Sequence, residues 1–382
     1  MKRSRIRIQC LPLLGDHLKT EVESMDYKVL NHNATGVEIE GDFEDCIRLN
    51  LFLRTATRVL YQLKRFTAKD SKALYDEVFS YSWPRLLRAN GYLHVDSFVK
   101  HAEVRDTSYP NRVVKDAVVD SLQKYYGRRP DSGPSRHGTV LYLFWTEKEG
   151  MIYLDTSGEV IAKHGYRKNP HKAPMMESLA ASTILASVWD KKQPFVNPMC
   201  GSGTLAIEAA LMAKNQPPGL HRDNFGFMHC KWFRRARFEE LTDLARRQAG
   251  SKGPMPTIIA TDRDQRAIRA AEANAAEAGV RDMITFEVCD FRETQLPEEE
   301  GVIFMNPEYG ERLGEAERLQ PTYKAIGDFF KQEAAGYTGY VFTGNMDLAK
   351  KIGLRTSRKI PFMNGRIECR LLEYEMYHGS RR

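Results

Sequence analysis

The second half of this sequence contains apolar runs that end on glycines, acids or a polar-aromatic turn. The first run ends at Asn197, passes into a turn with Gly201 and Gly203, and meets a helix-forming stretch at Thr204. Because glycine has no Cβ, the turn can be sharp and a ligand can lie against its backbone. A helix that opens there offers unpaired N–H groups and the positive end of its dipole. The pattern indicates the strand, glycine turn and helix of a nucleotide site.

Two glycines alone would suit a plain turn equally well. No third glycine stands at the dinucleotide spacing and no Gly-Lys-Ser/Thr follows, so the turn is not a P-loop. Acids end the next two runs: Asp262 closes residues 257–262, and Asp290 follows residues 284–289. An acid at the tip of the second strand is where ribose hydroxyls are held in nucleotide folds, but either acid could instead cap the next helix.

A fourth apolar run, residues 301–305, is stopped by Asn-Pro-Glu-Tyr-Gly at 306–310. A rigid turn of this kind places an amide and an aromatic ring at the end of a buried strand. Four strand ends that carry glycines, acid, acid and Asn-Pro-x-Tyr in this order are a far more specific signal than any one of them.

These strand ends resemble those of class I, S-adenosylmethionine-dependent methyltransferases that modify an exocyclic amino nitrogen of a base. Asn-Pro-Met-Cys-Gly-Ser-Gly-Thr at 197–204, Asn-Pro-Glu-Tyr-Gly-Glu-Arg-Leu at 306–313 and residues 173–181 are similar to motifs of the large-subunit ribosomal RNA guanine-N2 methyltransferases. The N-terminal half resembles a THUMP RNA-binding module. The likeness therefore covers nearly the whole chain.

The resemblance implies S-adenosylmethionine as cofactor and implies no metal. Asn197, Cys200 and the two glycines would surround its methionine end, Asp262 the ribose diol, and Asp290 the adenine amino group. The helix expected from Pro174 to about Val188 would abut the pocket, or would merely pack through its alanines. The implied cofactor residues are Ser178, Asn197, Cys200, Gly201, Gly203, Thr204, Asp262, Arg263, Asp290, Phe291 and Asn306.

The implied reaction moves a methyl group to an amine whose lone pair is delocalised into a base. Acceptors near that nitrogen stabilise the developing positive charge in the transition state. By resemblance, the Asn306 side chain and the Pro307 carbonyl are these acceptors. Tyr309 would stack on the base, which is worth ~1–3 kcal/mol. A base within a duplex must be unstacked first, so we expect a flipped or loop guanine.

Two positions depart from the family pattern. Glu308 stands where a second proline is usual, which loosens the turn because proline would fix φ. Its carboxylate could be a further acceptor or could point away, and reduced activity stays open. Asn197 stands where an acid is common, which weakens the expected pairing with the cofactor ammonium.

The elements that would position these residues define an α/β fold. We expect an N-terminal α+β region, ferredoxin-like plus THUMP, and then a Rossmann-like seven-stranded methyltransferase domain with a C-terminal antiparallel hairpin. The expected domains are 1–66, 67–166 and 167–382. Apolar spacings of three and four predict helices over Phe43–Lys64, 69–80 and Asn111–Tyr126.

Basic residues in two regions could pair with RNA phosphates. One region, with Arg112, Lys115, Arg128 and Arg129, resembles the signature stretch of THUMP modules, but an ordinary solvated helix would look similar. The other is an insertion between Leu211 and Pro256 where cations alternate with aromatics. There a satellite core with Trp232 and Phe233 buried is at least as good an interpretation. The candidates in the insertion are Lys231, Arg234 and Arg235.

The bulk composition is that of an ordinary globular chain. It has 382 residues, 42% hydrophobic and 28% charged, and a net charge of +7 that fits an RNA partner without requiring one. Six widely spaced cysteines suggest neither a zinc site nor a disulfide framework. No run is long enough to span a membrane and the start lacks a signal peptide, so we expect a cytoplasmic protein with no obligate protein partner.

Four hypotheses remain at this stage. The first is a guanine-N2 methyltransferase for large-subunit ribosomal RNA. The same chemistry on transfer RNA and an adenine-N6 methyltransferase are its nearest rivals. The fourth, from a different class, is a non-catalytic RNA-binding assembly factor, which Glu308 would permit.

Overall fold

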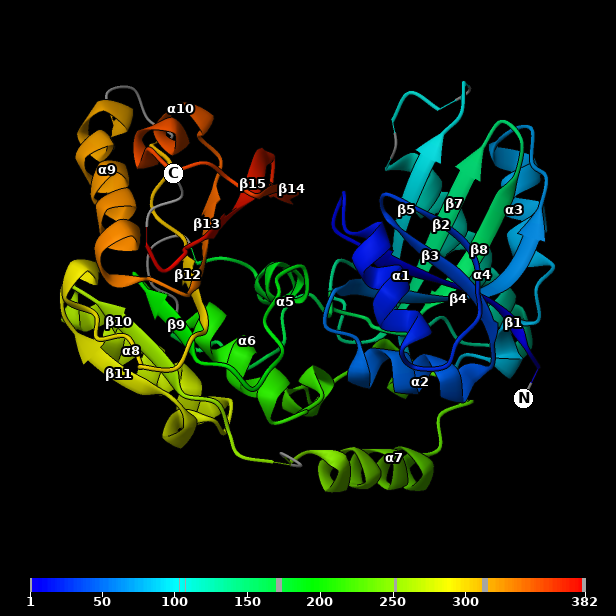
Figure 1. Cartoon of the computed structure of the whole chain (residues 1–382). Helices are drawn as coiled ribbons and strands as arrows, with labels where there is room; N and C mark the ends of the chain where they lie inside the picture. The colour runs from blue at the N-terminus through cyan, green and yellow to red at the C-terminus, as the bar shows by residue number, and fades with distance from the viewer. Residues whose placement is uncertain are drawn as a thin grey trace. The chain divides into compact units, whose positions relative to one another are not determined.

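The computed structural model describes residues 2–102, 104–106, 108–169, 174–250, 253–310 and 315–379. The chain divides into two compact units, coloured along the sequence in Figure 1. Unit 1 contains residues 1–10, 18–161 and 222–244, and unit 2 contains residues 11–17, 162–221 and 245–382. Part of the predicted insertion therefore folds with the N-terminal unit.

Unit 1 is built on one eight-stranded sheet with the order β2-β3-β1-β4-β8-β7-β5-β6. Ile6 and Ile8 are buried while the alternating Arg5 is exposed, as expected of a half-buried strand. Its strands are β1 (Ser4–Cys10), β2 (Val29–Asn33), β3 (Gly36–Gly41), β4 (Ala56–Phe66), β5 (Tyr92–Lys100), β6 (Asp131–Ser132), β7 (Thr139–Thr146) and β8 (Gly150–Asp155). The helices in this part of the chain are α1 (Gly15–Glu23), α2 (Phe43–Phe52), α3 (Ser71–Phe79) and α4 (Tyr109–Tyr126).

The prediction of one helix over Phe43–Lys64 is wrong. Helix α2 ends at Phe52, the next residue is extended, and residues 56–66 form β4 between β1 and β8. Val59, Leu60 and Tyr61 are consecutive and all buried, so this strand lacks the alternation that marks a half-buried one. Its apolar residues consequently matched a helical spacing by chance. The helices predicted at 69–80 and 111–126 correspond to α3 and α4.

Aromatic side chains of the insertion pack into unit 1. The Trp232 ring meets the rings of Phe43 and Tyr61 edge-on, at centroid distances of 5.7 and 5.9 Å. Phe233 packs against Phe227 and Phe238 at 5.9 Å each. Trp232 and Phe233 pack against these rings as in a satellite core, but they are half-buried and not fully buried as that interpretation expected. Helix α7 (Arg235–Gln248) follows them.

Unit 2 contains a seven-stranded sheet with the order β11-β10-β9-β12-β13-β15-β14, which confirms the predicted Rossmann-like fold. The neighbouring strands β11, β10, β9, β12 and β13 are parallel, and β15 is antiparallel to β13 and β14. The last two form the predicted C-terminal hairpin. The strands are β9 (Phe195–Pro198), β10 (Ile258–Asp262), β11 (Thr285–Val288), β12 (Val302–Met305), β13 (Thr338–Thr343), β14 (Arg358–Asn364) and β15 (Ile367–Glu375).

Helices of unit 2 lead into and out of these strands. The helix predicted from Pro174 begins only at Glu177, because Met176 is still extended. The described helices are α5 (Glu177–Leu185), α6 (Thr204–Ala213), α8 (Gln265–Glu277), α9 (Glu315–Glu333) and α10 (Met346–Ala349).

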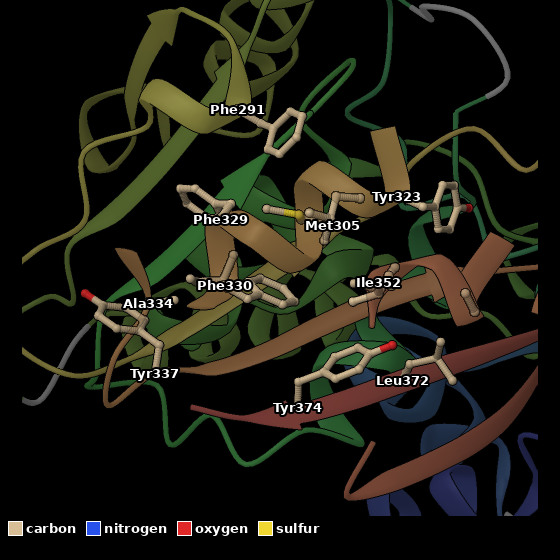
Figure 2. Packing of buried hydrophobic residues seen from close by; sticks show 14 of the residues in the cluster. Phe291, Met305, Tyr323, Phe329, Phe330, Ala334, Tyr337, Ile352, Leu372 and Tyr374 are labelled. Carbon is tan, nitrogen blue, oxygen red and sulfur yellow. The ribbon is translucent and has the colours of Figure 1, made fainter. Parts of the chain in front are cut away.

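An aromatic core supports the strands that end at the site. Figure 2 shows Phe329 and Phe330 of α9 among the side chains of β12 and β15, and Phe291 lies 6.1 Å from the Phe329 ring. A Cβ on Gly339 would lie 2.6 Å from the Phe330 ring, so β13 approaches the helix closely where it has no side chain. This packing holds the ends of β12 and β13 in place.

Candidate cofactor and catalytic site

The predicted site residues gather where the order of the sheet reverses. Strand β9 lies between β10 and β12, so the chain leaves β9 toward one side of the sheet and later returns on the other. In open α/β sheets, ligands bind in the crevice outside the carboxyl ends of the strands at this switch point. The structure thus brings together the ends of β9, β10 and β12, as the sequence predicted.

The loop after β9 alternates between left-handed and ordinary backbone conformations. Met199, Gly201 and Gly203 have φ angles of 57°, 56° and 82°. At Gly203 an added Cβ would also lie 2.8 Å from the Cβ of Ala271, so the start of α6 packs closely on α8. At Gly201 an added Cβ would meet no atom of the described residues within 4 Å. The Gly201 backbone therefore faces open space, as a ligand cradle requires.

Asp262 fastens this loop to the end of β10. Its Oδ2 accepts the Gly201 N–H at 3.0 Å, and its Oδ1 accepts the Asp264 N–H at 2.9 Å. The cap of α8 is Asp264, which accepts the Arg266 N–H, so Asp262 is not a simple helix cap. Arg263 between the two acids is exposed. Contact of Asp262 with a ribose stays a prediction.

Buried polar atoms without a hydrogen-bond partner among the described residues include Asn197 Oδ1 at the end of β9, Ser202 Oγ within the loop and Ser178 Oγ in α5. The Asn197 Nδ2 donates to the Phe304 carbonyl of β12 at 2.8 Å, but its Oδ1 is unpartnered, and the residue is 1% exposed. The Ser178 Oγ at the start of α5 is likewise unpartnered in a fully buried residue. Such groups are rare in native structures because each costs a hydrogen bond. They are suited to a polar ligand.

Cys200 and Thr204 have roles in the loop that the sequence did not predict. Burial raises the pKa of the Cys200 thiol well above its usual value, so it stays protonated and is no nucleophile. The Thr204 Oγ1 accepts a hydrogen bond from Arg167 Nη2 at 3.0 Å. Gly203 supplies no side-chain cap, so the first turn of α6 keeps its amides for a ligand.

A cavity of about 340 Å³ lies beside the start of α5. Arg167 Nη2 also donates to the Met175 carbonyl at 2.5 Å and lies 3.4 Å from the Glu177 carboxylate. Burial raises the pKa of Glu177. The cavity is lined by Lys163, Gly165, Arg167, Pro174, Met176 and Glu177.

Asp290 and Phe291 are engaged in local structure. Asp290 accepts the Arg292 N–H at 3.1 Å as the cap of a short 3-10 helix, and hydrogen bonds from the Arg292 guanidinium lower its pKa. This is the capping alternative left open by the sequence. Phe291 is 9% exposed and packs in the core shown in Figure 2. Contacts of both residues with adenine stay predictions.

The turn after β12 is held from several sides. The Tyr309 hydroxyl donates to Asn306 Oδ1 at 2.7 Å, which joins the two predicted catalytic side chains. The Tyr323 hydroxyl donates to the Glu308 carbonyl at 3.1 Å, and Asn345 Nδ2 donates to the Tyr309 carbonyl at 3.1 Å. These two supporting residues come from α9 and from the residue that caps α10.

The Glu308 side chain itself is exposed. The substituted position therefore affects the turn chiefly through its backbone, whose carbonyl Tyr323 already holds. Sequence reasoning missed Tyr323 and Asn345 because no local pattern links them to the turn residues that they bind, which lie 15 and 36 residues away in the chain. Pro307 is buried beneath the turn. Residues 311–313 of the motif lie outside the described residues.

The predicted RNA-binding cations of unit 1 differ in how they are held. Arg128 is exposed, and five others make salt bridges or hydrogen bonds with neighbouring groups: Arg112 with Asp106, Lys115 with Asp116, Arg129 with Asp120, Arg234 with the Lys231 carbonyl, and Arg235 with Glu239. Such exposed ion pairs are weak, so phosphates can replace the acids. Lys231 is different, because its Nζ donates to the Pro84 carbonyl at 2.9 Å and to the Tyr126 hydroxyl at 2.5 Å.

Within residues 2–379 as far as they are described, no group of three or more His, Cys, Asp and Glu side chains is placed to hold a metal ion. Over the same ranges, no helix is both long and apolar enough to cross a membrane.

The sheet order, the glycine loop at its switch point and the C-terminal antiparallel strands together define a Rossmann-like methyltransferase fold. The family described as UPF0020, RMKL-like methyltransferase domain, matches residues 164–373. This chain belongs to that family. A second family, the RlmL ferredoxin-like domain, matches residues 6–60.

Individual relatives agree with this assignment. A protein of Syntrophotalea carbinolica named Ribosomal RNA large subunit methyltransferase K/L is 36% identical over 96% of this chain and 52% of its own length. The chain spans about half the length of the curated relatives of that name.

Two solved structures are similar over nearly the whole chain. The crystal structure of SMU.472, provisionally assigned as a methyltransferase and complexed with SAH, has a TM-score of 0.88 and 26% identity, and covers 100% of both chains. A Listeria monocytogenes protein described as a predicted N6-adenine-specific DNA methylase has a TM-score of 0.87 and 29% identity, and covers 98% of this chain and 97% of its own.

Proposed function

We propose that this protein transfers a methyl group from S-adenosylmethionine to the exocyclic N2 of a guanine in large-subunit ribosomal RNA. S-adenosylmethionine is the cofactor, since SAH, which SMU.472 holds, is what remains of it after methyl transfer. The ribosomal substrate is supported by the names of the K/L relatives. The Asn-Pro-x-Tyr turn at 306–309 supports an exocyclic amine of a base as the methyl acceptor, and the resemblance of residues 197–204 and 306–313 to motifs of guanine-N2 methyltransferases favours the guanine N2.

The residues around the glycine loop fit this cofactor, which supplies an electrophilic methyl group when bound. Asn197 Oδ1 and Ser178 Oγ would hold polar groups of its methionine part, which gives both unpartnered atoms a hydrogen bond. Gly201 and the first turn of α6 would lie against it. Asp262, held at the end of β10, would bind its ribose, and Asp290 and Phe291 would border its adenine.

The observation that carries the proposal is the hydrogen bond between Tyr309 and Asn306 at the end of β12. A carbonyl oxygen has two lone pairs, so Asn306 Oδ1 can accept from the target amine while keeping its bond to Tyr309. The Pro307 carbonyl would be the second acceptor, and both favour the positive charge that develops on nitrogen. The Tyr309 ring would stack on the flipped base.

No strong general base is needed in this scheme. The amine becomes a far stronger acid once it carries the methyl group, so it can release its proton to water after transfer. This agrees with a turn that offers an amide and a carbonyl as acceptors rather than a buried carboxylate, since Glu308 is exposed.

The N-terminal unit would deliver the RNA as a THUMP-type module. Arg128 and the cations of α4, Arg112 and Lys115, would meet phosphates, together with Arg129, Arg234 and Arg235, because they lie at or near the surface of that unit. Lys231 is the weakest member of the set, because its two internal hydrogen bonds would have to be given up.

The proposal is tested with ribosomal and transfer RNA from cells with and without the protein. Mass mapping should find one guanine-N2 methyl group in large-subunit ribosomal RNA that disappears with the gene and returns with wild type but not with Asn306→Ala. Loss of a methyl group from transfer RNA or from an adenine N6 instead would replace the substrate assigned here. Unchanged RNA, together with no calorimetric heat from SAH, would favour the non-catalytic assembly factor.

A further inference from the structure

Asn274 of α8 is a buried amide that ties two segments of unit 2 together. Its Oδ1 accepts the N–H groups of Lys168 and Asn169 at 3.1 and 2.9 Å. Its Nδ2 donates to the Asn169 carbonyl at 2.9 Å and to the Ser202 carbonyl at 3.2 Å. An amide offers two N–H donors and two lone pairs, so all four positions are in use in a residue that is 0% exposed.

The Ser202 carbonyl lies at the centre of the glycine loop. Ser202 stands between Gly201, whose N–H is held by Asp262, and Gly203, which is the N-cap of α6. Both glycines have positive φ angles and no side chain to restrict them. The hydrogen bond from Asn274 therefore fixes the Ser202–Gly203 peptide group, whose neighbouring glycines leave its orientation free.

Arg167 donates a hydrogen bond to Thr204, the residue on the other side of Gly203. Its Nη2 donates to Thr204 Oγ1 at 3.0 Å, while the next two residues, Lys168 and Asn169, are bound by Asn274. The segment 167–169 is thus bonded to Ser202 on one side of Gly203 and to Thr204 on the other. Besides these bonds the loop is held by Asp262, by the Cys200 N–H, which donates to the Thr261 carbonyl at 2.9 Å, and by its own turn.

We propose that Asn274 is a positioning residue for the cofactor loop. It holds the Ser202 carbonyl away from the cofactor side, so that the Gly201 backbone and the amides of α6 face the ligand. This inference rests on the function proposed above, since it assigns how that same site is kept in its binding form. The residue touches no ligand itself and acts through the loop.

The variant Asn274→Asp separates the two halves of the amide. It keeps the acceptor for Lys168 and Asn169 but replaces the donor to Ser202 with a carboxylate oxygen that faces two carbonyls. We expect SAH affinity at pH 8 to fall about tenfold or more, the effect of a lost buried donor and an added repulsion. Burial against carbonyls raises the pKa of the introduced carboxyl, and once protonated it can donate to Ser202 again. Affinity should therefore recover as the pH falls.

The measurement is calorimetric titration of the full chain with SAH between pH 5.5 and pH 8, for the wild type and three variants. Glu272→Gln is a control on the same helix, because its carboxylate pairs with Arg281, which lies outside the loop. Ile268→Val is a control for stability, because it removes a buried methyl group from the same helix. Thermal unfolding of each variant accompanies the titrations.

The expected result is a pH-dependent loss of affinity in Asn274→Asp alone. If Ile268→Val, at an equal loss of thermal stability, weakened SAH as much, or if Asn274→Asp bound SAH like the wild type at pH 8, the positioning role would be overturned. A loss in Asn274→Asp that is the same at every pH would also overturn it. A wild-type chain that binds no SAH would instead refute the proposed function, so the two failures are distinct.

Discussion

The Tyr323 hydroxyl offers a test of how the catalytic turn is held. It donates to the Glu308 carbonyl and is 2.8 Å from Thr343 Oγ1, in a residue that is 0% exposed. Tyr323→Phe removes only this oxygen and keeps the ring in the core of Figure 2. The substitution leaves a buried threonine hydroxyl and a turn carbonyl without a partner, which should lower the free energy of unfolding by about 1–2 kcal/mol.

The effect on catalysis depends on how much of this free energy of unfolding keeps the catalytic turn in its conformation. If it all holds the turn that carries Asn306 and Tyr309, kcat should fall about five- to thirtyfold, because 1.36 kcal/mol corresponds to a factor of ten. The KM for S-adenosylmethionine should change little, because the glycine loop lies on other strands. Burial raises the pKa of Tyr323 to about 12. The phenol therefore contributes its full stabilisation below pH 10 and loses it only as the pH rises through 12.

Tyr337→Phe is the matched control. Tyr337 is 3% exposed in the same core, and its hydroxyl donates to the Pro297 and Glu299 carbonyls, which precede β12, whereas the turn follows that strand. The assay is methyl transfer to the mapped RNA under steady-state conditions, with urea unfolding in parallel. Equal losses of stability with a lower kcat only in Tyr323→Phe are expected. Equal kcat values for the two variants would refute the idea that Tyr323 supports catalysis through the turn.

Two further predictions concern the cofactor loop. Asp262→Ala leaves the Gly201 and Asp264 N–H groups without their charged acceptor, and hydrogen bonds to a charged group are worth roughly 1.5–3 kcal/mol. The SAH affinity measured by calorimetry should therefore fall about 10- to 150-fold. An unchanged affinity would show that Asp262 is not part of the cofactor site. Gly201→Ala adds a methyl group at a positive φ of 56°, where no atom of the described residues lies within 4 Å, so it should cost about 1 kcal/mol of stability. Because the methyl group would occupy the space expected for the cofactor, the SAH affinity should fall strongly. A variant that lost stability alone would show that this space is not the cofactor cradle.

The order of the strand ends could be predicted because each signal is local. An apolar run, a turn and the first residues of a helix are neighbours in sequence, so Asn197, Gly201, Asp262 and Asn306 were found without knowledge of the fold. The rule that parallel strands present their carboxyl ends at one edge then placed them together.

Local sequence patterns gave a wrong prediction where burial removed the usual alternation of apolar and polar residues in a strand. Strand β4 is buried on both faces, so its apolar residues show no alternation, and the sequence suggested a helix instead. The same limit applies to Trp232 and Phe233, whose spacing beside arginines suits RNA as well as packing. Only the rings of Phe43 and Tyr61, far away in the chain, decide that Trp232 packs.

The sequence by itself determined the class of this protein: a glycine loop, two acids and Asn-Pro-x-Tyr at successive strand ends, each readable from residues a few positions apart. The tertiary structure alone decided which side chains keep those ends in place. Asn274, Tyr323 and Asn345 act on groups up to 106 residues away, through side-chain hydrogen bonds that leave no periodic pattern in the sequence. Such contacts depend on the packing of whole elements, and packing is not encoded in any short stretch of sequence.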